Sequence, residues 1–410
     1  MRTHMLDLGF SSQDVEEHLI VTGYWNTESK RERHACVLTP CAYILHEESQ
    51  LTDAARALHA AVMQLETTLA GLSQRHHLAH AESRFLRMAK SASHGLLRPG
   101  EDSGLAIPPM VKIDMVRDRS GEWYAVEVDT YNPRALGTIA LVDALVKRAN
   151  KTPASCVVLR LAAMLGNERE WAIIISEKER YYGTSYEVLG SLLQKNGVRI
   201  RFVSEKEVAK NISMLRCRDG PFHTFLIPEN MDRHPEIRTY LLAEYRAGFV
   251  RTIYPPKAYL GSKAFLPFIA AQKGVNNTVP PTALLTDWVE NCIFSRPRSS
   301  DRIILKPVHS SGSRGIIRQD DLDSFYKTIK EEKQSKNPLW IAQQEVAQEP
   351  IAVTVFDGKS RVVMLYYLRL TMYATAEGIA GLKITGRPEK IVHGAPDCIQ
   401  LPVIRTSTRQ

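Results

Sequence analysis

The sequence predicts a mixed α/β protein, because three kinds of pattern occur in different parts of the chain. Apolar residues at helical spacing dominate the N-terminal part, strand and helix patterns alternate over about 168–256, and strand patterns dominate after about 340. Alternating strands and helices are typical of a parallel sheet with crossover helices. A chain of 410 residues is long enough for about two or three domains and a large core.

The N-terminal part is expected to be mostly helical after an irregular start. Residues 52–70 carry apolar side chains at helical spacing, with Asp53 in the first turn and Gly71 as a stop signal. A second helix is expected over about 75–91. Prolines and glycines within 98–109 then indicate a loop.

Residues 111–128 predict two strands joined by a turn at 119–121. Alternation puts Glu127 and Asp129 on one face of the second strand, and pairing in register brings Asp114 to the same end. Three converging carboxylates repel one another unless a cation lies among them, and such hard oxygen ligands suit Mg²⁺. Taken alone, an exposed hairpin with solvated charges explains this segment equally well.

The middle of the chain is expected to form a small parallel sheet. Helices are predicted at 135–149 and 154–165, followed by strands at 171–176, 198–203, 224–228 and 249–253 and by helices at 181–196 and 236–247. The segment has no GxGxxG pattern, so we do not interpret it as a dinucleotide site.

A strand at 301–306 ends in Lys306 and leads into HSSGSRG at 309–315. Glycines let a backbone approach an anion closely, and N–H groups and hydroxyls present donors to it. We therefore expect this loop to be mobile in the free protein and to close over nucleotide phosphates. A plain hairpin turn is the alternative.

The C-terminal part carries further candidate ligands. Ser262 and Lys263 open an apolar helix, and Gln343, Gln344 and Glu345 can present polar groups to an adenine edge. Arg369 lies in an apolar strand and needs an anionic partner, either a phosphate or a structural carboxylate. The remaining elements are predicted as a helix at 320–333 and strands at 315–318, 340–346, 351–356, 361–373, 382–385 and 390–393.

Together these segments resemble an ATP-grasp nucleotide site: a strand pair ending D…ExD, a helix beginning with SK, a KPxxSSGSRG flap, an AQQE segment and a strand-borne arginine. In the usual ATP-grasp order the lysines come first, whereas here the carboxylates precede Lys263 and Lys306. That order is similar to the circularly permuted ATP-grasp group, with glutathionylspermidine synthase as its familiar member. The resemblance covers about 100–403.

The resemblance implies that Asp114, Glu127 and Asp129 hold Mg²⁺, although the family usually has asparagine where Asp129 stands, and that Arg369 and Arg387 are catalytic. It implies an ATP site made of Lys263, Lys306, Ser310, Ser311, Gly312, Ser313, Gly315, Gln343, Gln344 and Glu345. The implied domains are a helical N-terminal region (1–105), the metal-binding hairpin and helices (106–167), a pre-ATP-grasp-like parallel-sheet domain (168–256) and the lysine, flap and C-terminal strand region (257–410).

The implied function is an ATP-dependent carboxylate–amine ligase that acts through an acyl phosphate. A small-molecule kinase and a non-catalytic nucleotide-binding module are the alternatives. The expected partners are an acid, small-molecule or peptide, and an amine, and a homodimer is compatible with the family. No apolar run approaches the roughly 20 residues of a membrane span. The start has no secretory pattern, so we expect a cytoplasmic protein with no membrane partner.

The net charge of +8 does not indicate a nucleic-acid partner, because the basic residues are spread along the whole chain and no basic run is interleaved with aromatic residues. An acidic small ligand or an ordinary solvated surface explains the charge equally well.

Overall fold

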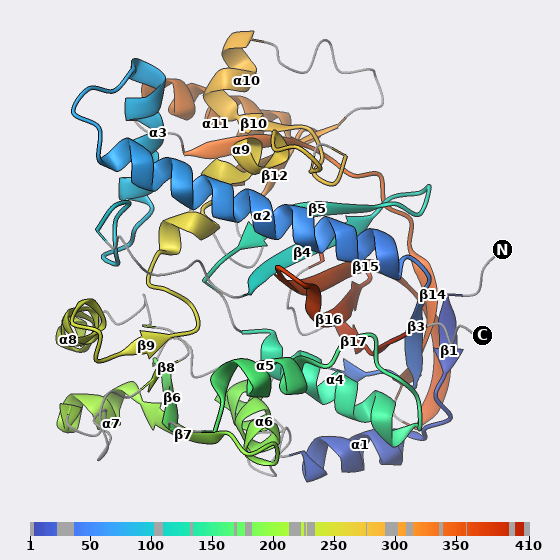
Figure 1. Cartoon of the computed structure of the whole chain (residues 1–410). Helices are drawn as coiled ribbons and strands as arrows, with labels where there is room; N and C mark the ends of the chain where they lie inside the picture. Colours follow the sequence, from blue (N-terminus) through green and yellow to red (C-terminus); the bar gives the residue numbers. More distant parts are fainter. Residues whose placement is uncertain are drawn as a thin grey trace.

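The computed structural model describes most of the chain (Figure 1). The described residues are 4–22, 37–101, 110–131, 134–167, 170–176, 183–212, 223–224, 227, 234–275, 277–291, 302–308, 315–335, 339–357, 359–392 and 398–405. They form a mixed α/β structure, as predicted.

The largest sheet has seven strands in the order β2-β17-β16-β15-β4-β5, with β14 paired to β15. Its strands are β2 (Val37–Leu38), β4 (Val111–Arg117), β5 (Trp123–Asp129), β14 (Ile351–Asp357), β15 (Ser360–Thr375), β16 (Gly378–Arg387) and β17 (Ile399–Leu401). Long β15 pairs antiparallel with β4, β14 and β16. Because side chains alternate along each strand, the sheet has one apolar and one largely polar face near its centre.

Helix α2 (Glu48–Ser73) lies across the apolar face (Figure 1). Its Leu58 and Leu65 belong to the same buried cluster as Ile113 of β4 and Leu370 of β15. The other face is covered at one end by α4 (Leu136–Arg148) and α5 (Val157–Leu165). Gly381 permits that approach, because a Cβ there would lie 3.0 Å from Val157 Cγ2.

A second, antiparallel sheet has four strands in the order β10-β13-β11-β12. Its strands are β10 (Thr282–Leu284), β11 (Ile303–Pro307), β12 (Ile317–Arg318) and β13 (Trp340–Gln344). Helices α10 (Leu285–Asn291) and α11 (Leu322–Gln334) cover it through a cluster that contains Leu285, Leu305 and Phe325. Helix α3 (His80–Ser91) is tied to α10 by the ion pair of Arg84 and Asp287 at 2.9 Å.

The predicted small parallel sheet is confirmed, with the order β7-β6-β8-β9 and parallel pairing throughout. Its elements are β6 (Glu170–Ile175), α6 (Gly183–Gln194), β7 (Arg199–Ser204), α7 (Glu205–Lys210), β8 (His223–Thr224), α8 (Pro235–Arg246) and β9 (Arg251–Thr252).

The start of the N-terminal region, which the sequence predicts as irregular, forms secondary structure. Besides α1 (Ser12–Val21), it contains β1 (Met5–Asp7) and β3 (Cys41–Leu45), which form a sheet with β18 (Val403–Arg405) near the opposite end of the chain. Strand β2 pairs in parallel with β17. Strands β2 and β3 pair with strands more than three hundred residues away, which local patterns cannot reveal.

Two other local predictions are wrong. The helix expected after Ser262 is a 3₁₀ turn, η4 (Lys263–Phe265), followed by short α9 (Leu266–Ala270), and it is preceded by another 3₁₀ turn, η3 (Ala258–Gly261). The strand expected at 390–393 is an irregular segment over its described residues, 390–392. Among the helices that the structure describes, none is long and apolar enough to cross a membrane.

Candidate functional site

Strands β4 and β5 form the predicted hairpin. The carboxylate of Asp118 in the turn accepts the N–H groups of Gly121 and Glu122 at 2.9 and 3.0 Å. Gly121 has φ +99°, a conformation that favours glycine. Asp114 pairs with Glu127, so the expected approach of these two residues is confirmed.

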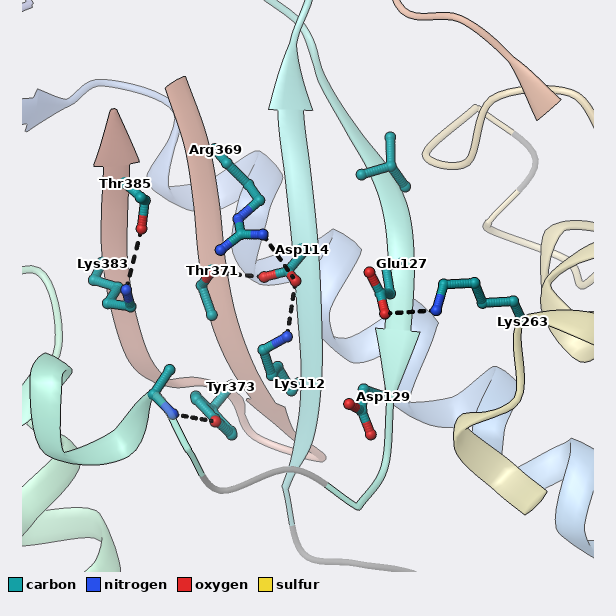
Figure 2. Close-up of polar contacts among 12 residues, drawn as sticks. Lys112, Asp114, Glu127, Asp129, Lys263, Arg369, Thr371, Tyr373, Lys383 and Thr385 are labelled. Carbon is teal, nitrogen blue, oxygen red and sulfur yellow. Dashed lines mark hydrogen bonds and ion pairs between the residues drawn. The ribbon is translucent and has the colours of Figure 1, made fainter. Parts of the chain in front are cut away.

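Asp114 is the most buried carboxylate of the hairpin, with 3% of its side chain exposed. It accepts hydrogen bonds from Lys112 Nζ at 2.8 Å and Thr371 Oγ1 at 2.6 Å, and Arg369 Nη1 lies 3.8 Å away (Figure 2). Burial alone would raise the pKa of Asp114, but the charges of Arg369 and Lys112 outweigh it and hold this pKa well below its usual value. Asp114 is therefore an anion between two cations.

Glu127 and Asp129 follow along the same face of β5. Glu127 Oε1 forms an ion pair with Lys263 Nζ at 3.1 Å (Figure 2). Burial opposes ionisation of Glu127, yet the charges of Lys263 and Lys112 lower its pKa. Asp129 Oδ1 accepts the N–H of Tyr131 at 2.9 Å, and its backbone partner on β4 is Lys112. The hairpin carboxylates are thus balanced by nearby lysines.

Lys306 lies at the end of β11 and is 5% exposed. Its ammonium donates to Gln343 Oε1 at 2.6 Å and to the carbonyl of Val126 on β5 at 3.0 Å. Gln343 in turn donates to Thr282 Oγ1 at 2.9 Å. Burial lowers the pKa of Lys306 to about 8. This lysine therefore connects the four-stranded sheet to the seven-stranded sheet through uncharged acceptors.

A partly open pocket of about 810 Å³, including space open to solvent, lies where the two sheets face each other. Its charged lining residues are Asp114, Glu127, Lys263, Lys306, Arg318, Glu345, Arg369 and Lys390. The other lining residues are Val116, Val126, Ile304, Ile316, Gln344, Val346, Gln348, Ile391 and Val392.

The structure brings seven of the predicted site residues into this lining: Asp114, Glu127, Lys263, Lys306, Gln344, Glu345 and Arg369. Four others are described but are not among the lining residues: Asp129, Gly315, Gln343 and Arg387. Ser310, Ser311, Gly312 and Ser313 lie outside the described residues, as does all of the predicted flap except Gly315.

Gln343 and Arg387 have other contacts than the sequence predicts. Gln343 is fully buried and supports Lys306. Arg387 donates to the carbonyl of Ile391 at 3.1 Å and pairs with Glu389 at 3.0 Å. Both side chains therefore hold groups that line the pocket.

Sequence reasoning missed several pocket residues, including Arg318, Gln348 and Lys390. The place of Arg318 in the pocket could have been predicted, because Arg318 ends a predicted strand close to the glycine- and serine-rich segment. The sequence predicts a strand at Lys390, whereas the structure has an irregular segment there. Local patterns do not predict that this segment reaches the pocket.

The carboxylates of the hairpin are candidate metal ligands. In the described part of the chain, no group of three or more His, Cys, Asp and Glu residues is arranged to hold one. Mg²⁺ usually needs only one or two carboxylates when substrate phosphates complete its shell. Asp114 and Glu127 line the pocket and provide the two carboxylates that such a site needs. The role of Asp129 as a metal ligand stays a prediction.

Comparisons with known proteins do not assign the chain to a family. No family model matches the sequence, and no curated protein is similar to it.

Proposed function

We propose that the protein is an ATP- and Mg²⁺-dependent carboxylate–amine ligase that forms an amide bond through an acyl phosphate. The observation that supports this function is the pocket between the seven-stranded and the four-stranded sheet. Five cationic side chains and three carboxylates line it, which leaves a surplus of two positive charges. A surplus of positive charge in a partly enclosed pocket favours an anionic ligand.

A nucleoside triphosphate matches both the apolar and the cationic residues of this lining. Valine and isoleucine side chains provide apolar surface for a base, and Gln344 and Glu345 provide polar groups at its edge. Lys263 and Lys306 provide charge for phosphates, and charge-assisted hydrogen bonds are the stronger kind. Lys306 is suited to exchange partners, because its present acceptors, Gln343 Oε1 and the Val126 carbonyl, are neutral.

Asp114 and Glu127 would hold the Mg²⁺ that accompanies the nucleotide. Bound there, the ion would supply neutralisation of the charge on the phosphates. The residues of the chain would position the reactants and stabilise the charge that develops on the transferred group, which is most of what phosphoryl transfer requires.

The proposed reaction has two steps. A carboxylate oxygen of the acid attacks the γ-phosphorus and ADP leaves, with Arg369 beside Asp114 placed to stabilise the equatorial oxygens of the phosphoryl group. The amine nitrogen then attacks the acyl carbon, phosphate leaves with the bonding electron pair, and the amine releases a proton. Water must be excluded while the acyl phosphate exists.

The test is turnover of ATP with Mg²⁺ and a panel of carboxylic acids, with and without a panel of amines. We expect ADP and phosphate to form in step only when acid and amine are both present, and hydroxylamine to trap the acyl phosphate as a hydroxamate. A stable phosphorylated product without any amine would instead identify a kinase. ATP binding without turnover under every condition would identify a nucleotide-binding module.

A variant in the pocket is compared with a control variant outside it. Arg369→Met should abolish hydroxamate formation, whereas the same change at Arg302, which is exposed and lies outside the pocket lining, should not. Equal activity of the two variants would contradict the role of Arg369.

A further inference from the structure

Two of the five cations in the pocket are not matched by a carboxylate. Ion pairs join Lys263 to Glu127 at 3.1 Å, Arg318 to Glu345 at 3.2 Å and Arg369 to Asp114 at 3.8 Å. Lys306 donates to two uncharged oxygens. The ammonium of Lys390 forms no ion pair or hydrogen bond with any residue that the structure describes. Lys306 and Lys390 therefore account for the surplus positive charge.

Lys390 is held by its backbone although it lies in an irregular segment. Its carbonyl accepts a hydrogen bond from Gln348 Nε2 at 3.4 Å, and the carbonyl of the next residue, Ile391, accepts one from Arg387 Nη1 at 3.1 Å. Val392, which follows, is 6% exposed. A residue whose own carbonyl and following residues are held in place is better suited to recognise a ligand than a freely moving surface lysine.

Arg369 lies in the same pocket and is only partly matched. It shares Asp114 with Lys112, which is the closer partner at 2.8 Å against 3.8 Å. Its Nε atom is buried without a hydrogen-bond partner among the described residues. A buried donor that lacks a partner is costly unless a ligand satisfies it.

We propose that Lys390 binds the carboxylate of the acid substrate next to the phosphates on Lys263 and Lys306, with Arg369 between this carboxylate and the phosphoryl group that it attacks. This inference rests on the proposed ligase function, in which a nucleotide and an acid, both anionic, occupy the pocket at the same time. Arg387, which the sequence predicts as catalytic, then acts as a positioning residue that holds the segment of Lys390.

The first experiment is acetylation of lysines by an amine reagent, measured by mass spectrometry on the full chain. Its probes are Mg²⁺ with a non-hydrolysable ATP analogue, alone and together with acetate, succinate or L-glutamate. We expect the analogue alone to lower labelling of Lys306 and to leave Lys390 reactive. A carboxylate added to that complex should then lower labelling of Lys390, while exposed Lys359 stays unchanged as the internal control.

Two results would overturn the inference: protection of Lys390 by the analogue alone, which would place it among the nucleotide ligands, or no protection by any of the three carboxylates. The labelling needs no turnover. A wild-type protein that forms no hydroxamate would therefore refute the ligase function without changing this readout.

Variants give a second measurement. Lys390→Met should raise the half-saturating acid concentration in the hydroxamate assay about tenfold or more, because a charge-assisted bond is lost. Its affinity for ATP should be unchanged, and Lys390→Arg should restore most of the acid affinity. Lys359→Met is the matched control. An unchanged acid dependence in Lys390→Met would show that Lys390 does not bind the acid.

Discussion

Lys112, which is 12% exposed, and the buried Lys306 differ in how their charge is balanced. Lys112 lies on β4, where burial alone would lower its pKa, but Asp114, Glu127 and Asp129 outweigh burial and raise it. Lys306 lies on β11, where burial dominates and lowers its pKa to about 8. The seven-stranded sheet thus carries charges that compensate one another, whereas the four-stranded sheet carries a cation that an incoming anion would stabilise.

The difference teaches which side of the site supports the fold and which side is arranged for a ligand. A buried charge with a charged partner becomes costly when that partner is removed. A buried cation bonded only to neutral acceptors gains most when an anion binds. Changes on the carboxylate side should therefore lower stability as well as Mg²⁺ binding, whereas changes at Lys306 should act mainly on binding.

The largest effect is expected from Asp114→Asn. The substitution leaves Lys112 and Arg369 buried beside a neutral group, so the free energy of unfolding should fall by about 3–5 kcal/mol. Urea denaturation at pH 7 measures it. Asp53→Asn is the matched control, because the Asp53 side chain is 77% exposed and its change should be small. If both variants were equally stable, the carboxylate side would not be a stabilising network.

Lys306→Met should separate binding from stability. Loss of its charge should weaken ATP binding about tenfold or more, because a charge-assisted bond to phosphate is lost. The free energy of unfolding should change less than in Asp114→Asn, because removing the buried charge offsets the two acceptors left unpaired. Calorimetric titration with ATP and urea denaturation measure the two quantities. Normal ATP affinity would exclude Lys306 from the phosphate site.

The third prediction uses pH. The pKa of Lys306 is about 8 in the folded protein, so the charge that attracts phosphate is present below that pH and is lost above it. Affinity for ATP should fall by up to about tenfold per pH unit above pH 8. Arginine keeps its charge in this range, so Lys306→Arg should show a weaker dependence. Titrations from pH 6.5 to 9.5 compare them, and identical profiles would assign the pH dependence to another group.

The same shift has the opposite sign for stability. Between pH 8 and the ordinary lysine value of 10.5, the unfolded chain binds a proton that the folded protein has released. The contribution of Lys306 to the free energy of unfolding therefore increases with pH over this window. Urea denaturation of wild type and Lys306→Met across the window isolates this contribution as their difference.

The smallest effect is expected at Gln343. Gln343→Leu removes the acceptor of Lys306, so ATP affinity should fall only a few-fold, since Val126 still orients the amine. Gln343→Glu should move the midpoint of the pH profile upward, because a carboxylate stabilises the ammonium. Gln64→Glu at an exposed helix position is the control. An unmoved midpoint in Gln343→Glu would mean that the profile does not report Lys306.

The sequence by itself determined the elements whose cause is local. The β4–β5 hairpin follows from alternation and from a turn that Asp118 and Gly121 stabilise. Helix α2 follows from its apolar spacing. The parallel sheet follows from a regular succession of short apolar strands and helices. In each case, the residues that specify the element lie within a few positions of one another.

Only the tertiary structure decided how these elements share partners. Asp114 and Thr371 are 257 positions apart and bond because β4 and β15 pair in one register. Gln343, a predicted adenine ligand, accepts a hydrogen bond from Lys306. Lys390 lines the pocket although it lies in an irregular segment. The physical reason is that a buried polar side chain must find its partner in space, and which residues become neighbours depends on the packing of the whole chain.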